Sequence, residues 1–262
     1  MATKPKKTAR YDLKAADRKR NLAIQIGLTA IVVVFAVALV LYIVMSGDKK
    51  NASTDEAKAI RVTSSNVITK EGSSDPKVVV SLYEDFLCPH CGQFEQQFGP
   101  TVRKLISTGA IAADYYMVAI LDRPLTQDYS SRAANAAYCV ADESTDAFQR
   151  FHDALFQEQP AEGGATYPDN ARLTELARQA GAGGSVPDCI SSGRYVDMSK
   201  GLAAATGIQA TPTIRINGED YETSTPDALV AKVREIVGNV PGLDGAAPPE
   251  QAPPQAPAPA AP

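Results

Sequence analysis

The sequence predicts an α+β domain of the α/β/α type with a helical insertion, preceded by one N-terminal transmembrane helix. Three observations predict this class. Short β-branched and apolar runs, which are typical of strands, occur on both sides of region 129–206. That region itself carries only helical spacing, and residues 22–45 form an apolar run without a charged side chain. The first two observations predict a small sheet split by helices, and the third predicts a membrane span.

The elements follow in order along the chain. We expect strands at residues 61–68, 78–83, 112–120, 212–217 and 219–221. Helices of the insertion are expected at 130–141, 145–158, 169–180, around Cys189 and at 196–205, and a final helix from the Thr225-Pro226 cap to Val237. A further helix should begin at or near Cys88, because apolar residues recur after it at helical spacing: Phe94, Phe98, Val102, Leu105 and Ile106. Pro100 is expected to kink that helix, since proline lacks an N–H and crowds an earlier carbonyl.

Composition divides the chain into five segments. They are a basic cytoplasmic arm at 1–21, a transmembrane anchor at 22–45, a polar juxtamembrane linker at 46–58, a folded domain at 59–239 with its insertion at about 128–206, and a tail at 240–262. The tail is rich in Pro and Ala, and we expect it to be disordered because such a composition buries too little apolar surface to fold.

The apolar run is 24 residues long, or about 36 Å as a helix, which is enough to cross a bilayer. A cleaved signal peptide is the alternative, but it would have a shorter apolar region and a small-residue cleavage site. Residues 1–21 carry eight Lys or Arg and two Asp, and such basic flanks stay in the cytoplasm. The flank also speaks against a buried helix of a soluble domain. We therefore expect a single-pass protein of the cell membrane, with a cytoplasmic N-terminus and an extracytoplasmic catalytic domain.

The charge distribution excludes one class of partner. The arm carries a net +6 and the whole chain −4, which leaves −10 for residues 22–262. An acidic exported part speaks against binding nucleic acid or an anionic membrane surface. The basic arm is sufficiently explained by membrane topology, and no nucleic-acid partner is expected.

Cys88-Pro89-His90-Cys91 places two cysteines and a histidine after a predicted strand and at the expected start of a helix. A thiol at a helix N-terminus faces free backbone N–H groups and the positive end of the helix dipole, and both favour the thiolate. A protonated His90 would favour it further. A stabilised thiolate keeps the pair reduced, so the oxidised pair is a strong oxidant. The motif predicts a redox-active disulfide, with Cys88, Cys91 and His90 as catalytic residues.

The remaining cysteines decide between this interpretation and a zinc site. Tetrahedral zinc would need a second close pair of ligands, but Cys139 and Cys189 lie far apart and His152 is the only other histidine, so no metal is expected. All four cysteines follow the apolar run, in a compartment where disulfides persist. We expect Cys139 and Cys189 to form a structural disulfide between two helices of the insertion. Two unpaired buried cysteines remain the alternative.

The chain resembles the DsbA-like branch of the thioredoxin superfamily over about residues 60–238. The residues that carry the resemblance are DFLCPHCGQF at 85–94 and GIQATPTIRING at 207–218. The helical insertion lies where this family has its helical subdomain. The anchor and the second cysteine pair resemble the membrane-tethered, four-cysteine DsbA homologues of actinobacteria.

The resemblance implies a thioredoxin-like fold and protein thiol:disulfide oxidoreductase activity. It implies that Cys88 is the exposed nucleophile and Cys91 the buried resolving partner. It further implies that Thr211, Pro212 and Pro89 bind the substrate, with Pro212 as a cis-proline that faces the disulfide. From the sequence alone, Thr211-Pro212 could equally be an ordinary start of a strand.

The sequence departs from the family at one position and is neutral at another. Many members place a buried proton-transfer glutamate six residues before the first cysteine, where this chain has Leu82. Glu84 and Asp85 are the nearby acidic residues, and the role is assigned to neither. Threonine before the cis-proline occurs in oxidising as well as in isomerising or reducing relatives, so Thr211 does not decide the direction of the reaction.

These observations predict a membrane-tethered oxidase that introduces disulfides into reduced exported proteins. The resemblance implies reoxidation by a membrane partner of the DsbB or vitamin K epoxide reductase type, with a quinone used only through that partner. The enzyme itself is expected to need no metal or organic cofactor. Two alternatives stay open: a disulfide reductase or isomerase with the same fold, and a non-catalytic module that binds clients or copper through its thiols.

Overall fold

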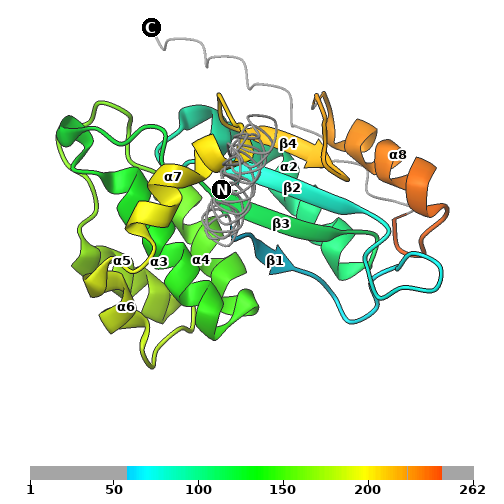
Figure 1. The fold of residues 1–262 in the computed structure, drawn as a ribbon, viewed down its shortest axis with the longest axis horizontal. Helices are drawn as coiled ribbons and strands as arrows, with labels where there is room; N and C mark the ends of the chain where they lie inside the picture. Colours follow the sequence, from blue (N-terminus) through cyan, green and yellow to red (C-terminus); the bar gives the residue numbers. More distant parts are fainter. Residues whose placement is uncertain (1–57, 223, 244–262) are drawn as a thin grey trace, which may run out of the picture. The chain divides into compact units, whose positions relative to one another are not determined.

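The computed structural model describes residues 58–222 and 224–243, which form an α+β fold around a five-stranded sheet (Figure 1). The strands are β1 (Ile60–Val62), β2 (Val79–Glu84), β3 (Ala112–Met117), β4 (Thr213–Ile216) and β5 (Glu219–Asp220). The helices are α2 (Pro89–Ser107), α3 (Tyr129–Glu143), α4 (Thr145–Gln157), α5 (Asn170–Gln179), α6 (Val186–Ser192), α7 (Val196–Thr206) and α8 (Pro226–Val237), with a short 3₁₀ turn at Pro124–Thr126.

The sheet has the order β1-β3-β2-β4-β5. β2 and β3 are parallel and are joined by α2, whereas the other neighbouring strands are antiparallel. All residues of β2 after Val79 are buried, which fits a β-branched run at the centre of a sheet covered on both faces. Because β2 leads directly into α2, the Cys88–Cys91 motif lies at the carboxyl edge of the central strand.

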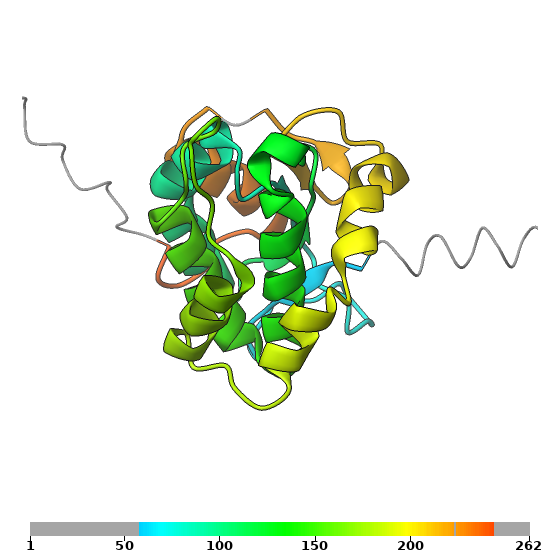
Figure 2. The same cartoon turned by 90° about the vertical axis from the view of Figure 1, so that its left-hand side faces the viewer.

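The helices between β3 and β4 form a separate group beside the sheet. In Figure 1 they gather on the left, while the strands and α8 lie to the right. Figure 2 looks onto this group and shows α3 running through its middle, where it contacts α4, α5, α6 and α7. The side chains of α3 from Tyr129 to Ala134 are buried except Arg132, because the neighbouring helices surround the helix. The insertion thus has a core of its own that is continuous with that of the sheet.

Two strands are shorter than predicted. The strand expected at 61–68 ends at Val62, since Val67 N–H donates to the Ser64 carbonyl in a turn and Ile68 N–H donates to Gly109. The strand expected at 112–120 ends at Met117, because the chain then bends so that Leu121 N–H can donate to Asp85. In both cases part of the apolar pattern continues after the chain has left the sheet, as at the half-buried Ile68 and the buried Val118, so periodicity alone does not reveal where the strand ends.

The predicted boundary of the folded domain at residue 239 is too early. Val240 and Leu243 are both buried, each with 3% of its surface exposed, so the core includes residues assigned to the tail. The predicted cap of the final helix is present: the Thr225 hydroxyl accepts from Ala228 N–H, with Pro226 at the first helical position. α2 continues through Pro100 as one helix to Ser107.

Among residues 58–222 and 224–243, no helix is both long enough and apolar enough to cross a membrane. The anchor predicted at 22–45, with the basic arm and most of the linker, lies outside the described residues, as does most of the predicted tail.

Candidate redox site

The turn between β2 and α2 is held by Asp85. This side chain is fully buried and accepts hydrogen bonds from Leu87 N–H and Leu121 N–H, each at 2.9 Å. Its backbone carbonyl accepts from Cys88 N–H at 2.9 Å. Burial is the main cause that raises the pKa of Asp85 to about 6, against these hydrogen bonds. Asp85 therefore fixes the loop that delivers Cys88 to the helix start.

Cys88 is the N-cap residue of α2, and Pro89 occupies the first position of the helix. Proline suits that place because its missing N–H would have no partner within the helix. The Cys88 carbonyl accepts from the N–H groups of Cys91 and Gly92 at 3.0 and 3.2 Å. The Cys88 side chain thus lies beside free N–H groups of the first turn, as the sequence predicted for a helix beginning near this residue.

Cys88 and Cys91 are free thiols in this structure and differ in their surroundings. A hydrogen bond from the Cys91 thiol is the largest cause that lowers the pKa of Cys88 to about 5, with further hydrogen bonds from Thr211 and from backbone N–H groups. Burial is the largest cause that raises the pKa of Cys91, followed by Cys88 itself and by Glu84. One thiol is therefore set to be ionised and the other to hold its proton.

One expectation for this motif needs correction, and a further contact was not predicted. Cys88 was expected to be exposed, but only 6% of its surface is accessible, since the Thr211 backbone lies against it with 3.4 Å between Cys88 Sγ and the Thr211 oxygen. The His90 side chain is exposed, and His90 lowers the pKa of Cys88 through its backbone N–H. The peptide group of His90 thus acts on Cys88, and the contribution predicted for its imidazole stays a prediction.

Thr211 and Pro212 follow the helical insertion in sequence, far from the Cys88–Cys91 motif, but lie next to it in the fold. The Thr211–Pro212 peptide bond is cis, and β4 begins one residue later at Thr213. β4 pairs with β2, with Thr213 opposite Tyr83. This pairing carries Thr211 to the position where its carbonyl oxygen contacts the Cys88 sulfur.

A cleft of about 1100 Å³ opens beside Pro89. Its walls come from the loop after β3, including Leu121 and Leu125, and from the segment after α4. Leu125 is 89% exposed, so the cleft offers an accessible apolar side chain. The cleft combines apolar and polar walls next to Cys88, and sequence patterns did not indicate it because its parts lie far apart in the chain.

Gln159 supports the Cys88–Cys91 motif through hydrogen bonds to backbone carbonyls, a role that sequence patterns did not predict. Its side-chain amide donates to the carbonyls of Phe86 and Cys88 at 3.0 and 2.9 Å. Gly92 makes room for it, since a Cβ atom there would lie 2.5 Å from Gln159 Oε1. The glycine after the motif is thus explained by the close approach of Gln159.

Three buried ionisable residues lie beneath the motif: Glu84 at the end of β2, Glu95 on α2 and His152 on α4. Glu84 Oε2 lies 3.0 Å from His152 Nε2. Burial, followed by Glu84, raises the pKa of Glu95. Burial opposes a charge on the His152 ring, but the surrounding carboxylates, Glu95 foremost, outweigh it and raise the pKa. Glu84 at the end of an apolar strand was a signal for this group, but nothing in the residue pattern indicated that His152 would meet it.

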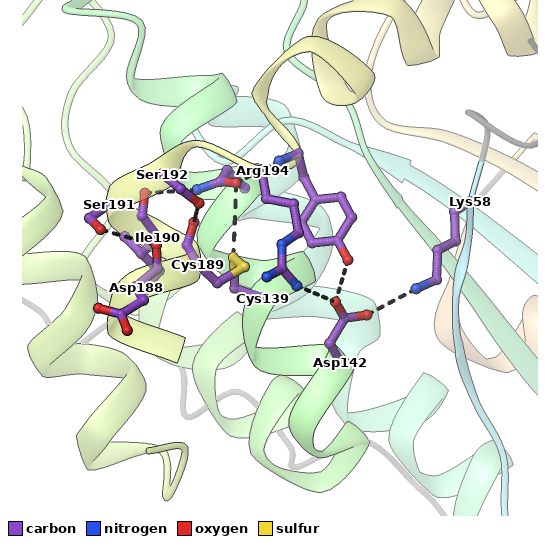
Figure 3. The surroundings of a disulfide bond; sticks show 11 residues. Lys58, Cys139, Asp142, Asp188, Cys189, Ile190, Ser191, Ser192 and Arg194 are labelled. Atoms are coloured by element: carbon purple, nitrogen blue, oxygen red, sulfur yellow. Dashed lines mark hydrogen bonds and ion pairs between the residues drawn. A yellow bond between two sulfur atoms is a disulfide. The ribbon is translucent and has the colours of Figure 1, made fainter. Parts of the chain in front are cut away.

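Cys139 on α3 and Cys189 on α6 are joined by a disulfide, with 5.8 Å between their Cα atoms (Figure 3). Nearby, the Asp142 carboxylate accepts from the Tyr195 hydroxyl and pairs with Lys58 at 2.9 Å. The bond ties two helices of the insertion together and belongs to a different element group from the CPHC motif.

Known proteins share this architecture. A family model described as thioredoxin matches residues 66–235. The crystal structure of reduced DsbA from Mycobacterium tuberculosis is 64% identical, with a TM-score of 0.70, and the match covers 71% of this chain and 96% of that one. The chain belongs to the thioredoxin family, in its DsbA-like branch. The reduced form of the disulfide bond oxidoreductase DsbG from the same organism is also 64% identical, with a TM-score of 0.71, covering 75% of this chain and 95% of that one.

Two more distant matches support only the fold or concern only part of a longer protein. MdbA, a thiol-disulfide oxidoreductase from Corynebacterium diphtheriae, is 22% identical with a TM-score of 0.55 over 66% of this chain and 88% of that one, and shares the fold. The serine/threonine-protein kinase PknE of M. tuberculosis is 29% identical over 160 residues, or 60% of this chain. This chain covers 28% of the length of that curated relative, so the similarity concerns one part of the kinase.

Proposed function

We propose that this protein is a membrane-tethered, extracytoplasmic thiol:disulfide oxidoreductase that introduces disulfides into exported proteins through Cys88 and Cys91. The observation that carries the proposal is the unequal pair of thiols at the start of α2. The pKa of Cys88 is lowered to about 5, whereas that of the fully buried Cys91 is raised. A stabilised Cys88 thiolate favours the reduced form of the pair, and the oxidised form is then a strong oxidant.

The reaction runs through a mixed disulfide. A substrate thiolate attacks Cys88 Sγ of the closed disulfide, the Cys88–Cys91 bond breaks, and its electron pair goes to Cys91, which takes up a proton. A second substrate thiolate then attacks the substrate sulfur bound to Cys88, and Cys88 leaves as a thiolate. Two electrons have passed from the substrate dithiol to the enzyme, and the substrate holds a new disulfide.

The surroundings of Cys88 support binding of an extended peptide. The Thr211 carbonyl next to the sulfur is an acceptor for a substrate N–H. The cleft beside Pro89 offers apolar contact through Leu121 and Leu125. A chain that is not yet folded exposes both backbone donors and apolar side chains, so this surface suits reduced, newly exported proteins.

Turnover requires reoxidation of the dithiol. We propose a membrane-embedded, quinone-linked partner of the DsbB or vitamin K epoxide reductase type as the electron acceptor. A shared membrane would raise the effective concentration of the two proteins toward each other. The apolar run at 22–45 and the basic residues before it support this arrangement.

Direction is tested by the reduction potential of the Cys88–Cys91 couple in glutathione buffers. An oxidase should have a reduction potential of about −120 mV, whereas a potential of about −270 mV would match a reductase. The oxidised protein should also convert a reduced dithiol peptide into its disulfide in a 1:1 ratio, with the enzyme dithiol appearing at the same rate. Failure to form the peptide disulfide would contradict the proposal and favour a client-binding module.

The anchor is tested by cell fractionation. The mature protein should sediment with membranes and retain its N-terminal arm, and a soluble form beginning near residue 46 would show that residues 22–45 are a cleaved signal. In a second arm, the domain without residues 1–45 is exported by another signal. It should oxidise peptide normally in vitro but be found more reduced in cells. Equal redox states of the tethered and soluble forms would show that tethering does not assist reoxidation.

A further inference from the structure

Glu84, Glu95 and His152 bring three metal-binding side chains together inside the protein. They come from β2, α2 and α4, and they keep 0%, 8% and 3% of their surfaces exposed. One potential ligand atom from each residue lies within 4.8 Å of the other two. This spacing is compatible with a single ion between them, since small shifts bring each ligand to the roughly 2.0–2.2 Å that zinc requires.

Two oxygens of this cluster have no hydrogen-bond donor among the described residues. Glu84 Oε1 and Glu95 Oε1 are both buried and unpartnered. His152 reaches only the other Glu84 oxygen, at 3.0 Å from Nε2. Buried carboxylate oxygens without a partner are costly, and two neighbouring carboxylates outside water require a compensating positive charge. The unpartnered atoms therefore point to a cation as their ligand.

We propose that Glu84, Glu95 and His152 Nε2 bind a Zn²⁺ ion. Two carboxylates balance the charge of the ion, and the imidazole, which gives up its Nε2 proton when the ion binds, adds a nitrogen ligand, so the loaded site as a whole is neutral. Carboxylate oxygen and imidazole nitrogen are ordinary zinc ligands, and three protein ligands leave one position for water. The site uses neither CPHC thiol as a ligand, although Glu84 also acts on the pKa of Cys91, and the proposal does not depend on the proposed oxidase activity.

The surroundings of His152 suit a ligand of fixed orientation. Its Nδ1 faces Asp153 Oδ1 at 4.0 Å, and Arg103 holds that carboxylate at 2.7 Å. A carboxylate on the Nδ1 side favours a proton on Nδ1 and leaves the Nε2 lone pair for the metal. The ring also packs against four aromatic side chains, which limit its rotation: Phe86, Tyr115, Phe148 and Phe156.

Glu95 connects the cluster with the surface. It lines a cavity of about 170 Å³ together with Arg103 and Asp153, and this cavity offers an entry path for an ion and its water. Gly99 lies on the same helix one turn after Glu95, and a Cβ atom there would be 2.6 Å from Glu95 Oε2. The absent side chain at residue 99 thus leaves the position of the Glu95 carboxylate open.

The test uses full-length protein in detergent, first oxidised so that Cys88 and Cys91 form a disulfide and supply no thiolate ligand. After chelator treatment, Zn²⁺ is added in competition with a chromophoric chelator. We expect one Zn²⁺ per chain and a higher thermal unfolding midpoint with zinc. Glu95→Gln should lower the affinity at least about tenfold, because it removes a charged ligand. Glu158→Gln, at an exposed carboxylate paired with Arg172, is the matched control and should bind as wild type does.

Three further results decide the proposal. The Cys88→Ser/Cys91→Ser double variant should bind zinc as the oxidised wild type does, which separates this site from the thiols. Co²⁺ should give visible absorption bands in the wild type that His152→Gln loses, and circular dichroism should show that this variant is folded. Absence of zinc binding by the oxidised wild type, or unchanged binding in both Glu95→Gln and His152→Gln, would overturn the proposal and show that the cluster is compensated by protons alone.

Discussion

The chain contains two cysteine pairs that differ in their spacing, their redox state and the atoms around their sulfurs. Cys88 and Cys91 lie three positions apart at the beginning of α2 and are free thiols, whereas Cys139 and Cys189 lie 50 positions apart on α3 and α6 and form a disulfide. All four are buried. Burial therefore does not distinguish the reactive pair from the structural one.

The polar atoms around the sulfurs do distinguish them. Cys88 is met by hydrogen-bond donors: the Cys91 thiol, the Thr211 side chain and the N–H groups of the first turn. Cys139 lies within α3, where the neighbouring polar atom is the Asn135 amide oxygen at 3.9 Å. Donors stabilise a thiolate and make it a good leaving group, and an oxygen does not. The atoms around the sulfurs therefore decide which disulfide is exchanged and which persists.

The largest effect is expected from the reactive pair. Cys88→Ser should reduce oxidation of a dithiol peptide to the uncatalysed background, because no mixed disulfide can form at residue 88. The Cys139→Ser/Cys189→Ser variant should oxidise the peptide at nearly the wild-type rate. Rates are measured by peptide fluorescence or mass spectrometry. Loss of peptide oxidation by the Cys139→Ser/Cys189→Ser variant while it is still folded would show that the second pair also takes part in turnover.

The second prediction concerns the free energy of unfolding, to which the Cys139–Cys189 pair should contribute although it takes no part in peptide oxidation. Removal of the Cys139–Cys189 disulfide should lower the free energy of unfolding by about 4 kcal/mol, because the open chain regains the entropy of a 50-residue loop. Denaturant unfolding of the double-serine variant measures this difference. Mass spectrometry of the unreduced wild type should find both thiols blocked, and free thiols at 139 and 189 would refute the assignment.

Much of this division could be predicted from the sequence. The β-branched run before the motif and the apolar spacing after it placed Cys88 at the start of a helix, because both signals are local. The absence of strand patterns in 129–206 predicted a helical insertion for the same reason. The order of the strands and the contact between Thr211 and Cys88 could not be predicted in this way. Both depend on the pairing of β2 with β4, which are far apart in sequence.

Other features of the site could not be predicted from the sequence, for physical reasons. Gln159 reaches the motif from the segment after α4, and His152 meets Glu84 across 68 positions of sequence. Polar residues on helices are usually solvated, so their spacing carries no signal of burial. The low exposure of Cys88 was missed as well, because it results from the contact with Thr211.

The third prediction uses pH to separate the two redox states of the reactive pair. The folded pKa of Cys88, about 5, lies below the value of about 8.5 for an unfolded cysteine. The thiolate therefore stabilises the reduced fold fully above pH about 8.5, and this stabilisation is lost as pH falls through about 5. Cys91, with a raised pKa, is protonated in both states below pH about 8.5 and adds no slope there.

We expect the free energy of unfolding of the reduced protein, relative to the oxidised protein, to rise with pH between about 5 and 8.5. The oxidised protein serves as the control because its disulfide cannot titrate while its carboxylates do. Denaturant unfolding of both states across this range measures the difference. A flat difference would mean that Cys88 is not ionised at neutral pH in the fold.

A smaller effect should separate the two parts of His90. In His90→Ala the backbone N–H remains, so the pKa of Cys88 should rise by the contribution of the imidazole but stay below the free-cysteine value of about 8.5. Thiolate absorbance titrated against pH gives the midpoints of wild type and variant. A wild-type midpoint near 8.5 would contradict the role of the helix start, and an unchanged midpoint in the variant would assign the whole contribution to the peptide group.

The smallest effect tests the support behind the reactive pair, which Gln159 provides. Gly92→Ala should displace Gln159, whose oxygen lies 2.5 Å from the new Cβ position, and weaken its bonds to the Phe86 and Cys88 carbonyls. The gain from replacing a helical glycine, about 0.5–1 kcal/mol, is then offset by the loss of one or two hydrogen bonds of about 1 kcal/mol each.

Gly201→Ala is the matched control for this change. Gly201 lies in α7 and has no atom within 4 Å of its Cβ position, so alanine should stabilise the fold there by about 0.5–1 kcal/mol. The two variants should therefore differ by about 1–2 kcal/mol in the free energy of unfolding, since only Gly92→Ala loses hydrogen bonds. Gln159→Ala should remove the difference, because without the amide both glycines become ordinary helix positions. If Gly92→Ala and Gly201→Ala stabilise the protein equally, the motif does not need support from Gln159, and its donors alone distinguish it from the second pair.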